Sequence, residues 1–197
     1  MKPFLHITAY LILVLSFASI TAAGDGDEIQ AAYEAGDFQQ VVKYTLARAE
    51  TGEVLAQHNL GYLYFNGKGT QVDYKEALKW YRKAADQGFA DSQYALGDMF
   101  YFGQGTAQDY QEAVKWYRFA AEQGHPQAQF NLGTLYVQGL GVMQSYEDAY
   151  AWWIVAAANG NESARVNMEI AHSGEMTPDQ IARGQQIAKE IWERLSN

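Results

Sequence analysis

Small and apolar residues recur along this chain at helical spacing, and the whole pattern repeats every thirty-six residues. The stretch 54–89 carries it first, and 90–125 and 126–161 repeat it. In the first half of each copy, these residues lie three and four positions apart, which defines one face of a helix. The positions are Ala56, Leu60, Leu63 and Tyr64, then Ser92, Leu96, Met99 and Phe100, then Ala128, Leu132, Leu135 and Tyr136. A period of this length predicts a solenoid of stacked supersecondary units.

Glycines and capping residues divide each copy into two helices. A Gly-x-Gly follows the first helix, and glycine tolerates the positive φ at which a helix ends and the chain reverses. Asp73 and Glu76 then have the spacing of a capping box, which predicts the start of a second helix. The corresponding pairs are Asp109 with Glu112 and, more weakly, Ser145 with Asp148. The second helices end at Gly88, Gly124 and Gly160, so each copy predicts a helical hairpin.

Two further sets of residues recur at the repeat period. Gly61, Gly97 and Gly133 fall within the first helix of each copy, where we expect close approach to a neighbouring helix. The other set comprises Trp80, Trp116 and Trp152. Periodic aromatic residues are typical of packing, so we interpret these tryptophans as structural.

The full pattern, A-x-x-x-LG-x-x-Y-x-x-G-x-G-x-x-x-DY-x-x-A-x-x-WY-x-x-AA-x-x-G, resembles the Sel1-like repeat, a relative of the tetratricopeptide repeat. Three copies match it over 54–161. The resemblance implies an all-α, right-handed α-solenoid of helical hairpins with atypical capping helices at its ends. It also implies an adaptor or scaffold function. Some secreted members of that family join their hairpins with cysteine pairs, but this chain has no cysteine. We therefore expect packing alone to stabilise it.

Residues 1–23 have the pattern of a secretory signal peptide. Lys2 precedes an apolar run over 7–20, and small residues follow from Thr21 to Gly24. A membrane anchor is the alternative, but the run is short for a bilayer span and small and acidic residues follow it at once. We therefore predict cleavage after Ala23 and export to a bacterial periplasm or beyond.

The two ends of the repeat array depart from the pattern, as terminal units of solenoids do. Residues 24–53 form a degenerate leading repeat, in which Asp37 is a candidate helix cap with Gln40. Residues 162–197 form a partial repeat and a C-terminal capping helix. Glu169 replaces the glycine of the other copies, so we expect different packing there. The last helix is predicted to close the core with Ile181, Ala188, Ile191, Trp192 and Leu195.

Charge and motifs limit the classes of function. The chain has 14 basic and 23 acidic residues, and loss of Lys2 with the leader changes the net charge from −9 to −10. Such a charge opposes binding to nucleic acid or to an anionic membrane. The sequence contains no phosphate-binding loop, no HExxH, no SxxK and no GxSxG. We therefore predict no catalytic, cofactor or metal site, and we disfavour an enzyme of cell-wall or β-lactam type.

A second face of the first helices is the candidate binding surface. At 100° per residue, it lies roughly 150° from the apolar face. Its residues are Leu55, His58, Tyr62, Phe65 and Asn66, then Asp91, Tyr94, Asp98, Tyr101 and Phe102, then Gln127, Phe130, Thr134, Val137 and Gln138. In the tetratricopeptide-like folds that this chain resembles, first helices line the concave surface, so these residues would form a partner-binding groove.

The composition of this predicted groove suggests its ligand. It is rich in aromatic side chains and holds two aspartates but no Lys or Arg, which suits a peptide, a helix or a sugar chain. We expect Tyr62, Asn66 and Asp98 to be exposed, whereas Tyr94, Tyr101 and Phe130 either line the groove or fill the interior. The favoured function is a non-catalytic protein-binding scaffold or regulator of the cell envelope, and the alternative is a carbohydrate-associated envelope protein.

Overall fold

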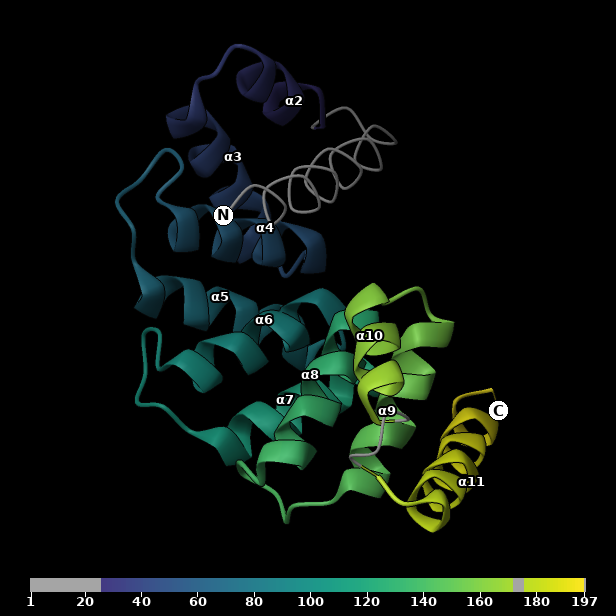
Figure 1. Cartoon of the computed structure of the whole chain (residues 1–197). Helices are drawn as coiled ribbons and strands as arrows, with labels where there is room; N and C mark the ends of the chain where they lie inside the picture. The colour runs from purple at the N-terminus through teal and green to yellow at the C-terminus, as the bar shows by residue number, and fades with distance from the viewer. Residues whose placement is uncertain (1–25, 172–175, 197) are drawn as a thin grey trace. The chain divides into compact units, whose positions relative to one another are not determined.

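The computed structural model describes residues 26–171 and 176–196, and within them the protein is entirely helical, with ten helices and no strand (Figure 1). The predicted signal peptide lies outside the described residues. The helices are α2 (Gly26–Glu34), α3 (Phe38–Glu50), α4 (Val54–Asn66), α5 (Tyr74–Asp86), α6 (Ala90–Phe102), α7 (Tyr110–Glu122), α8 (Pro126–Gln138), α9 (Tyr146–Ala158), α10 (Glu162–Ile170) and α11 (Pro178–Leu195). None of these described helices has both the length and the apolar character that a membrane crossing requires.

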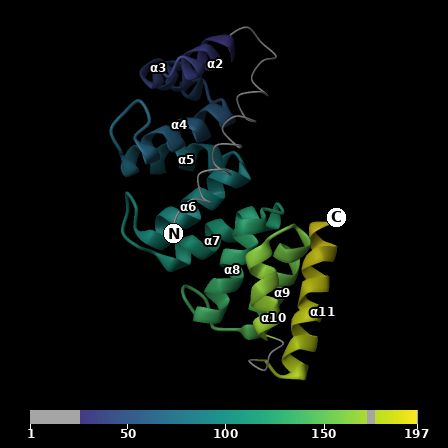
Figure 2. The same ribbon diagram turned by 45° about the horizontal axis from the view of Figure 1, so that its top comes forward.

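The helices belong to two compact units that divide between Gln87 and Gly88. In the first unit, α2 packs on α3, α3 on α4, and α4 on α5. In the second unit, α6 packs on α7, α7 on α8, and α8 on α9, while both α10 and α11 pack on α9 (Figure 2). The hairpins expected from the thirty-six-residue period are thus α4 with α5, α6 with α7, and α8 with α9.

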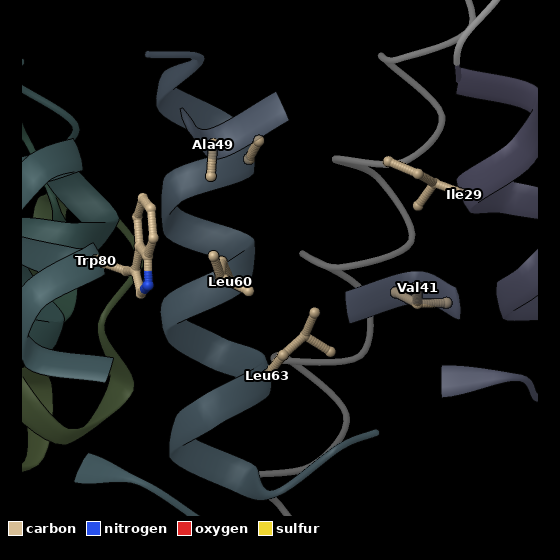
Figure 3. Close-up of a cluster of buried hydrophobic side chains, with 7 residues drawn as sticks. Ile29, Val41, Ala49, Leu60, Leu63 and Trp80 are labelled. Carbon is tan, nitrogen blue, oxygen red and sulfur yellow. The ribbon is translucent and has the colours of Figure 1, made fainter. Parts of the chain in front are cut away.

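The core of the first unit forms on the predicted apolar face of α4. Figure 3 shows Leu60 and Leu63 on this helix between Trp80 of α5 and Val41 of α3. All four side chains are at most 4% exposed. The equivalent residues of α6 and α8 are also buried, which confirms the apolar face at these positions, whereas Tyr64 and Tyr136 at its edge are half-buried.

The two glycines of the first Gly-x-Gly pair have different roles. Gly67 closes α4 in the left-handed conformation, with φ 66°, and its N–H donates to the Leu63 carbonyl. Gly69 also has a positive φ, and a Cβ there would lie 2.0 Å from the carbonyl oxygen of Phe38, the first residue of α3. The second glycine therefore allows the loop to contact the preceding hairpin, a role that its turn conformation alone does not reveal.

The predicted capping boxes form only in part. Asp73 caps α5 by accepting from the backbone N–H groups of Lys75 and Glu76, and Asp109 caps α7 in the same way. The reciprocal half of the prediction is wrong, because the Glu76 carboxylate accepts from Lys79 Nζ at 3.1 Å instead of from the cap backbone. A complete box is present at Thr177, where the Gln180 side chain accepts from the Thr177 N–H.

Close approach at the helical glycines is confirmed. A Cβ on Gly61, Gly97 or Gly133 would lie 2.4–2.7 Å from an aromatic ring of the paired helix. The rings are those of Tyr81, Tyr117 and Trp153, which directly follow the periodic tryptophans. Trp80, Trp116 and Trp152 are themselves 3–4% exposed, so their structural role is also confirmed.

Buried glutamines that recur every thirty-six residues link neighbouring helices by hydrogen bonds, a feature that was not predicted from the sequence. Gln129 is fully buried; its Nε2 donates to the Ala121 carbonyl at 2.9 Å, and its Oε1 accepts from Asn159 at 3.0 Å. Gln57 makes the corresponding bonds to Ala49 and Gln87. One side chain therefore ties the ends of two second helices to the first helix between them.

Replacing Gln129 with leucine is expected to destabilise the second unit by about 1–3 kcal/mol. The volume is nearly kept, but the Ala121 carbonyl loses one of its donors, and the Asn159 amide loses its acceptor on Gln129. Chemical denaturation would measure the change. Gln186→Leu is the control, since this glutamine of α11 is exposed. Equal stability of the two variants would show that the hydrogen bonds of Gln129 contribute nothing to the free energy of unfolding.

The C-terminal segment packs differently from the repeats, as expected. Glu169 is exposed, and α11 packs on α9 through Gly184, where a Cβ would lie 2.8 Å from the Tyr150 ring. Ala188 and Ile191 are buried.

The placement of Trp192 in the core is wrong, because it is 47% exposed. It lines a surface pocket together with Glu122 and Asn159, which stand at the C-terminal ends of α7 and α9. The neighbouring Ile191 is buried, as predicted.

Candidate functional site

Part of the predicted groove comes together in the second unit. Tyr94, Asp98 and Tyr101 are spaced four and three residues apart, so they share one face of α6. This face meets Phe130 and Thr134 of α8 around a pocket of about 250 Å³. We call it the α6–α8 pocket, and its lining residues are Asp98, Tyr101, Phe102, Tyr117, Phe130, Asn131, Thr134, Leu135 and Asn167.

Among the described residues that line the pocket, Asp98 alone is charged, and the surrounding helices fix its carboxylate. The Tyr117 hydroxyl of α7 donates to Oδ1 at 2.6 Å, and Asn131 Nδ2 of α8 donates to the same atom at 3.4 Å. The Tyr94 hydroxyl is a further donor to this carboxylate. Asp98 is half-buried, so the prediction of a freely exposed side chain is wrong.

Burial sets the acid–base behaviour of this cluster. Loss of solvation raises the pKa of Asp98, while the hydrogen bonds from Tyr117 and Tyr94 and the nearby His125 partly oppose that rise. Burial and the adjacent Asp98 also raise the pKa values of Tyr94 and Tyr117. Both phenols therefore remain neutral donors at physiological pH.

His125 supports the cluster from the start of α8. Its Nδ1 accepts from the Ala128 N–H at 3.2 Å, and this cap leaves the proton on Nε2, which lies 3.4 Å from Asp91 Oδ1. The imidazole stacks on the Tyr94 ring, with the centroids 4.6 Å apart. The cap thus orients a ring that in turn holds Tyr94 in place.

Aromatic side chains form the walls and rim of the pocket. Tyr101 contacts Phe102 and Tyr110 edge to face, with centroids 4.8 and 5.4 Å away. Phe130 also packs against the buried cluster around Trp153, which fixes that wall. Phe102 is 62% exposed and stands at the rim. The site therefore combines a rigid base with an apolar rim open to solvent.

The sequence matches the Sel1 repeat model at residues 54–89, 90–125 and 126–161, more than half of the chain. This chain belongs to the Sel1 repeat family. Proteins built from Sel1 repeats are generally protein-interaction scaffolds, typically without catalytic activity. The described helices, together with this match, make the fold an all-α helical repeat solenoid.

Solved structures of two similar proteins agree with this assignment. A Sel1 repeat protein from Oxalobacter formigenes is 34% identical with a TM-score of 0.70, and the match covers 77% of this chain and 61% of the other. The protein c5321, a protective antigen of uropathogenic Escherichia coli with an SLR fold, is 30% identical with a TM-score of 0.75. That match covers 93% of this chain and 40% of the other. This Sel1 repeat protein thus spans less than two thirds of either relative.

A more distant structure shares the fold alone. It is the Helicobacter pylori cysteine rich protein B, which is 18% identical with a TM-score of 0.52, over 74% of this chain and 98% of that one. A comparison with curated proteins gives no match.

The predicted groove residues of α4 belong to the first unit. Leu55 and Tyr62 pack against its core, and the His58 ring lies 5.4 Å from that of Tyr81. Phe65 contacts Tyr74 edge to face, whereas Asn66 is exposed as predicted.

Two expectations for the α4 face are corrected. Tyr62 is half-buried, so it is not a freely exposed residue. The face also carries a cation, because Lys68 Nζ lies 5.2 Å from the Tyr62 ring centroid. Lys68 stands inside the Gly-x-Gly loop, outside the helical rotation used to define the face, and was missed for that reason.

The remaining predicted residues of the second unit lie around the pocket but do not line it. Gln127 donates to Asn131 Oδ1 at 3.1 Å and accepts from Asn161. Val137 packs against the cluster around Trp153, and Gln138 is exposed at the end of α8. Asp91 lies at the start of α6 against His125.

Four described pocket residues were not predicted to line the groove, and one of them, Leu135, was assigned to the apolar face of α8. Tyr117 comes from a second helix, Asn131 lies between the two faces of α8, and Asn167 comes from α10. Only the packing of four helices brings them to Asp98.

The arrangement is suited to binding. The Thr134 hydroxyl donates to the Phe130 carbonyl, and the Asp98 carboxylate accepts from phenol and amide groups. Across residues 26–171 and 176–196, no three His, Asp or Glu side chains gather closely enough to hold a metal ion. The described lining of the pocket therefore offers one charged acceptor of hydrogen bonds, Asp98, among aromatic walls.

Asp98→Asn is expected to raise the melting temperature at pH 7. Folding raises the pKa of Asp98, so the folded state favours the protonated carboxyl. The stability that this carboxyl contributes is fully present below its unfolded-state pKa, near 3.8, and is lost as the pH rises through its folded-state pKa. Asparagine keeps an acceptor for Tyr117 without a buried charge. The gain should be smaller at pH 4 than at pH 7, because lowering the pH towards the raised folded-state pKa of Asp98 favours its neutral form.

Thermal melts at both pH values would test this expectation. Glu193→Gln removes an equal charge from an exposed side chain and serves as the control. A lower melting temperature for Asp98→Asn at pH 7 would show that the hydrogen bonds to the carboxylate outweigh its desolvation.

Proposed function

We propose that this Sel1 repeat protein is a non-catalytic scaffold or regulator of the bacterial cell envelope that binds another protein through the α6–α8 pocket. Scaffold proteins act by presenting a preformed surface, which reduces the ordering cost of binding. The family supports a protein partner, and the net charge of the chain argues against nucleic acid.

The observation that carries this proposal is a fixed base beneath an exposed aromatic rim. Tyr117 and Asn131 hold Asp98, while Phe102 is 62% exposed beside it. Energetically dominant contacts in protein interfaces are commonly aromatic side chains near pockets. The volume of about 250 Å³ is below the 300–1,000 Å³ typical of sites for whole small molecules. The pocket thus suits one side chain of a larger partner.

The place in the envelope rests on the N-terminal sequence. If residues 1–23 are a signal peptide, the protein in the envelope fraction should begin within a residue or two of Gly24. Intact-mass measurement of that fraction would check it. A mass that still includes Met1 to Ala23 would contradict the export proposal.

Crosslinking in native cells tests the binding proposal. A photoreactive residue at position 102 should capture a protein partner at the rim, whereas the same probe at the exposed position 186 of α11 should not. The captured partner should then bind the purified protein saturably, at fixed stoichiometry. Binding to glycan without a protein would favour the carbohydrate-associated alternative, and equal capture from both positions would remove the assignment to this pocket.

A further inference from the structure

We infer that the α6–α8 pocket recognises a basic side chain, lysine or arginine, in an exposed segment of the partner protein, with its cation on Asp98 and its stem between Tyr101 and Phe130. This inference rests on the proposed function and specifies the chemistry of the partner. It follows from three properties of the pocket: its charge, its walls and its size.

The described lining of the pocket carries one negative charge, on Asp98. His125 lies near this carboxylate, but its Nε2 faces Asp91 Oδ1 at 3.4 Å. Among the lining residues, Asp98 is acidic and none is Lys or Arg. No Lys or Arg in the described part of the chain forms an ion pair with Asp98. The groups that hold its carboxylate are the phenols of Tyr117 and Tyr94 and the amide of Asn131. A cation from outside would complete this site.

Desolvation strengthens the case for a cation. Burial raises the pKa of Asp98, so its ionised form is held at a cost in folding free energy. An ammonium or guanidinium group in the pocket would offset that cost through a charge-assisted hydrogen bond, which is stronger than one between neutral groups. A partner carboxylate or phosphate would instead meet a like charge with no basic residue on the lining.

The walls match the stem of a basic side chain. Tyr101, Phe102 and Phe130 present aromatic surface, which suits both the methylene groups of lysine or arginine and a cation–π contact. The net charge of −9 on the whole chain also favours the approach of a basic partner.

The size of the pocket limits the ligand. About 250 Å³ accommodates one long side chain but is small for a whole ligand. A metal ion is a poor alternative, because a single carboxylate among phenols and amides supplies too few strong oxygen ligands.

Selection from a random peptide library displayed on phage, with the purified protein as bait at neutral pH, tests the inference. We expect the selected peptides to share a lysine or arginine. In a synthetic selected peptide, replacing that residue by norleucine or citrulline should weaken binding by at least about tenfold in calorimetry. Asp98→Asn should weaken the unmodified peptide by a similar factor. The two changes should not add, because they remove the same contact.

Two controls separate this result from general effects. Glu193→Gln removes one exposed negative charge on α11 and should leave the affinity unchanged. The peptide that carries norleucine or citrulline is tested against the wild-type protein. This comparison therefore remains decisive even if Asp98→Asn alters folding.

The outcomes distinguish the inference from the proposed function. One outcome would overturn the inference and leave the pocket as the binding site. In that outcome the selected peptides contain no basic residue and bind Asp98→Asn as well as wild type, but lose affinity for Phe102→Ala. Selected peptides that are insensitive to both variants, or a selection that enriches no peptide, would count against both.

Discussion

Replacing Gly97 with leucine is expected to unfold the second compact unit at a temperature well below that of the wild type. A Cβ at this position of α6 would lie 2.4 Å from two ring atoms of Tyr117. Tyr117 is 2% exposed, and its hydroxyl donates to Asp98, so the ring has no room to retreat. Overpacking of this kind costs about 1–3 kcal/mol and occasionally more.

The helix propensity of leucine acts in the opposite direction but is the smaller effect. Replacing a glycine in a helix interior by a residue of higher helix propensity stabilises the helix by up to about 1 kcal/mol. Leucine adds three further carbons beyond the clashing Cβ, so the steric cost should dominate. The melting temperature of Gly97→Ala should lie between those of wild type and Gly97→Leu, since alanine gains a similar helix propensity and introduces only the Cβ contact.

Thermal melts followed by circular dichroism would measure the Gly97 series. A net loss of 1 kcal/mol corresponds to about 2–4 °C for a chain of this size. Ala182→Leu on α11 is the control, because it adds the same side chain at an exposed helical position. Coincident melts of Gly97→Leu and wild type would contradict the close packing of α6 on α7.

Combined replacement of Tyr101 and Phe102 by alanine is expected to abolish partner binding while changing the melting temperature little. Both side chains line the α6–α8 pocket, and neither is fully buried. Truncation of an aromatic hot spot costs roughly 2 kcal/mol or more of binding energy. Loss of two such side chains at one pocket would therefore weaken a micromolar complex beyond detection.

The control for this pair is Phe119→Ala on α7. Phe119 is 42% exposed and contacts Trp116, but it does not line the pocket. Affinity for the crosslinked partner would be measured by calorimetry. A double variant that melts far below wild type would identify Tyr101 and Phe102 as core residues. Loss of binding with Phe119→Ala alone would move the interface to another face.

Much of the fold could be predicted because its rules are local. A helical face depends on residues three and four apart, a cap on residues within one turn, and a helix end on a single glycine. The same signals occur in three copies, which removes the ambiguity of any one copy. Leu60, Leu96 and Leu132 are accordingly all buried.

Prediction failed where a side chain had two possible partners. Glu76 and Glu112 have the spacing of a capping box, but each pairs with a lysine one turn further along its helix. Trp192 and Ile191 both have the spacing of core residues, but in the packing of α11 on α9 only Ile191 is buried. The buried glutamines carried a periodic signal, although a polar residue at a core position gives no indication of its partner before the fold is known.

The sequence by itself determined the repeat, the helical hairpins and the face of α6 that carries Tyr94, Asp98 and Tyr101. Only the tertiary structure decided that Asp98 meets Tyr117 from α7 and Asn131 from α8. These contacts link residues 19 and 33 positions apart in the chain, so no helical periodicity encodes them. The environment that raises the pKa of Asp98 arises from the same packing, because solvent is excluded only after the three helices have come together.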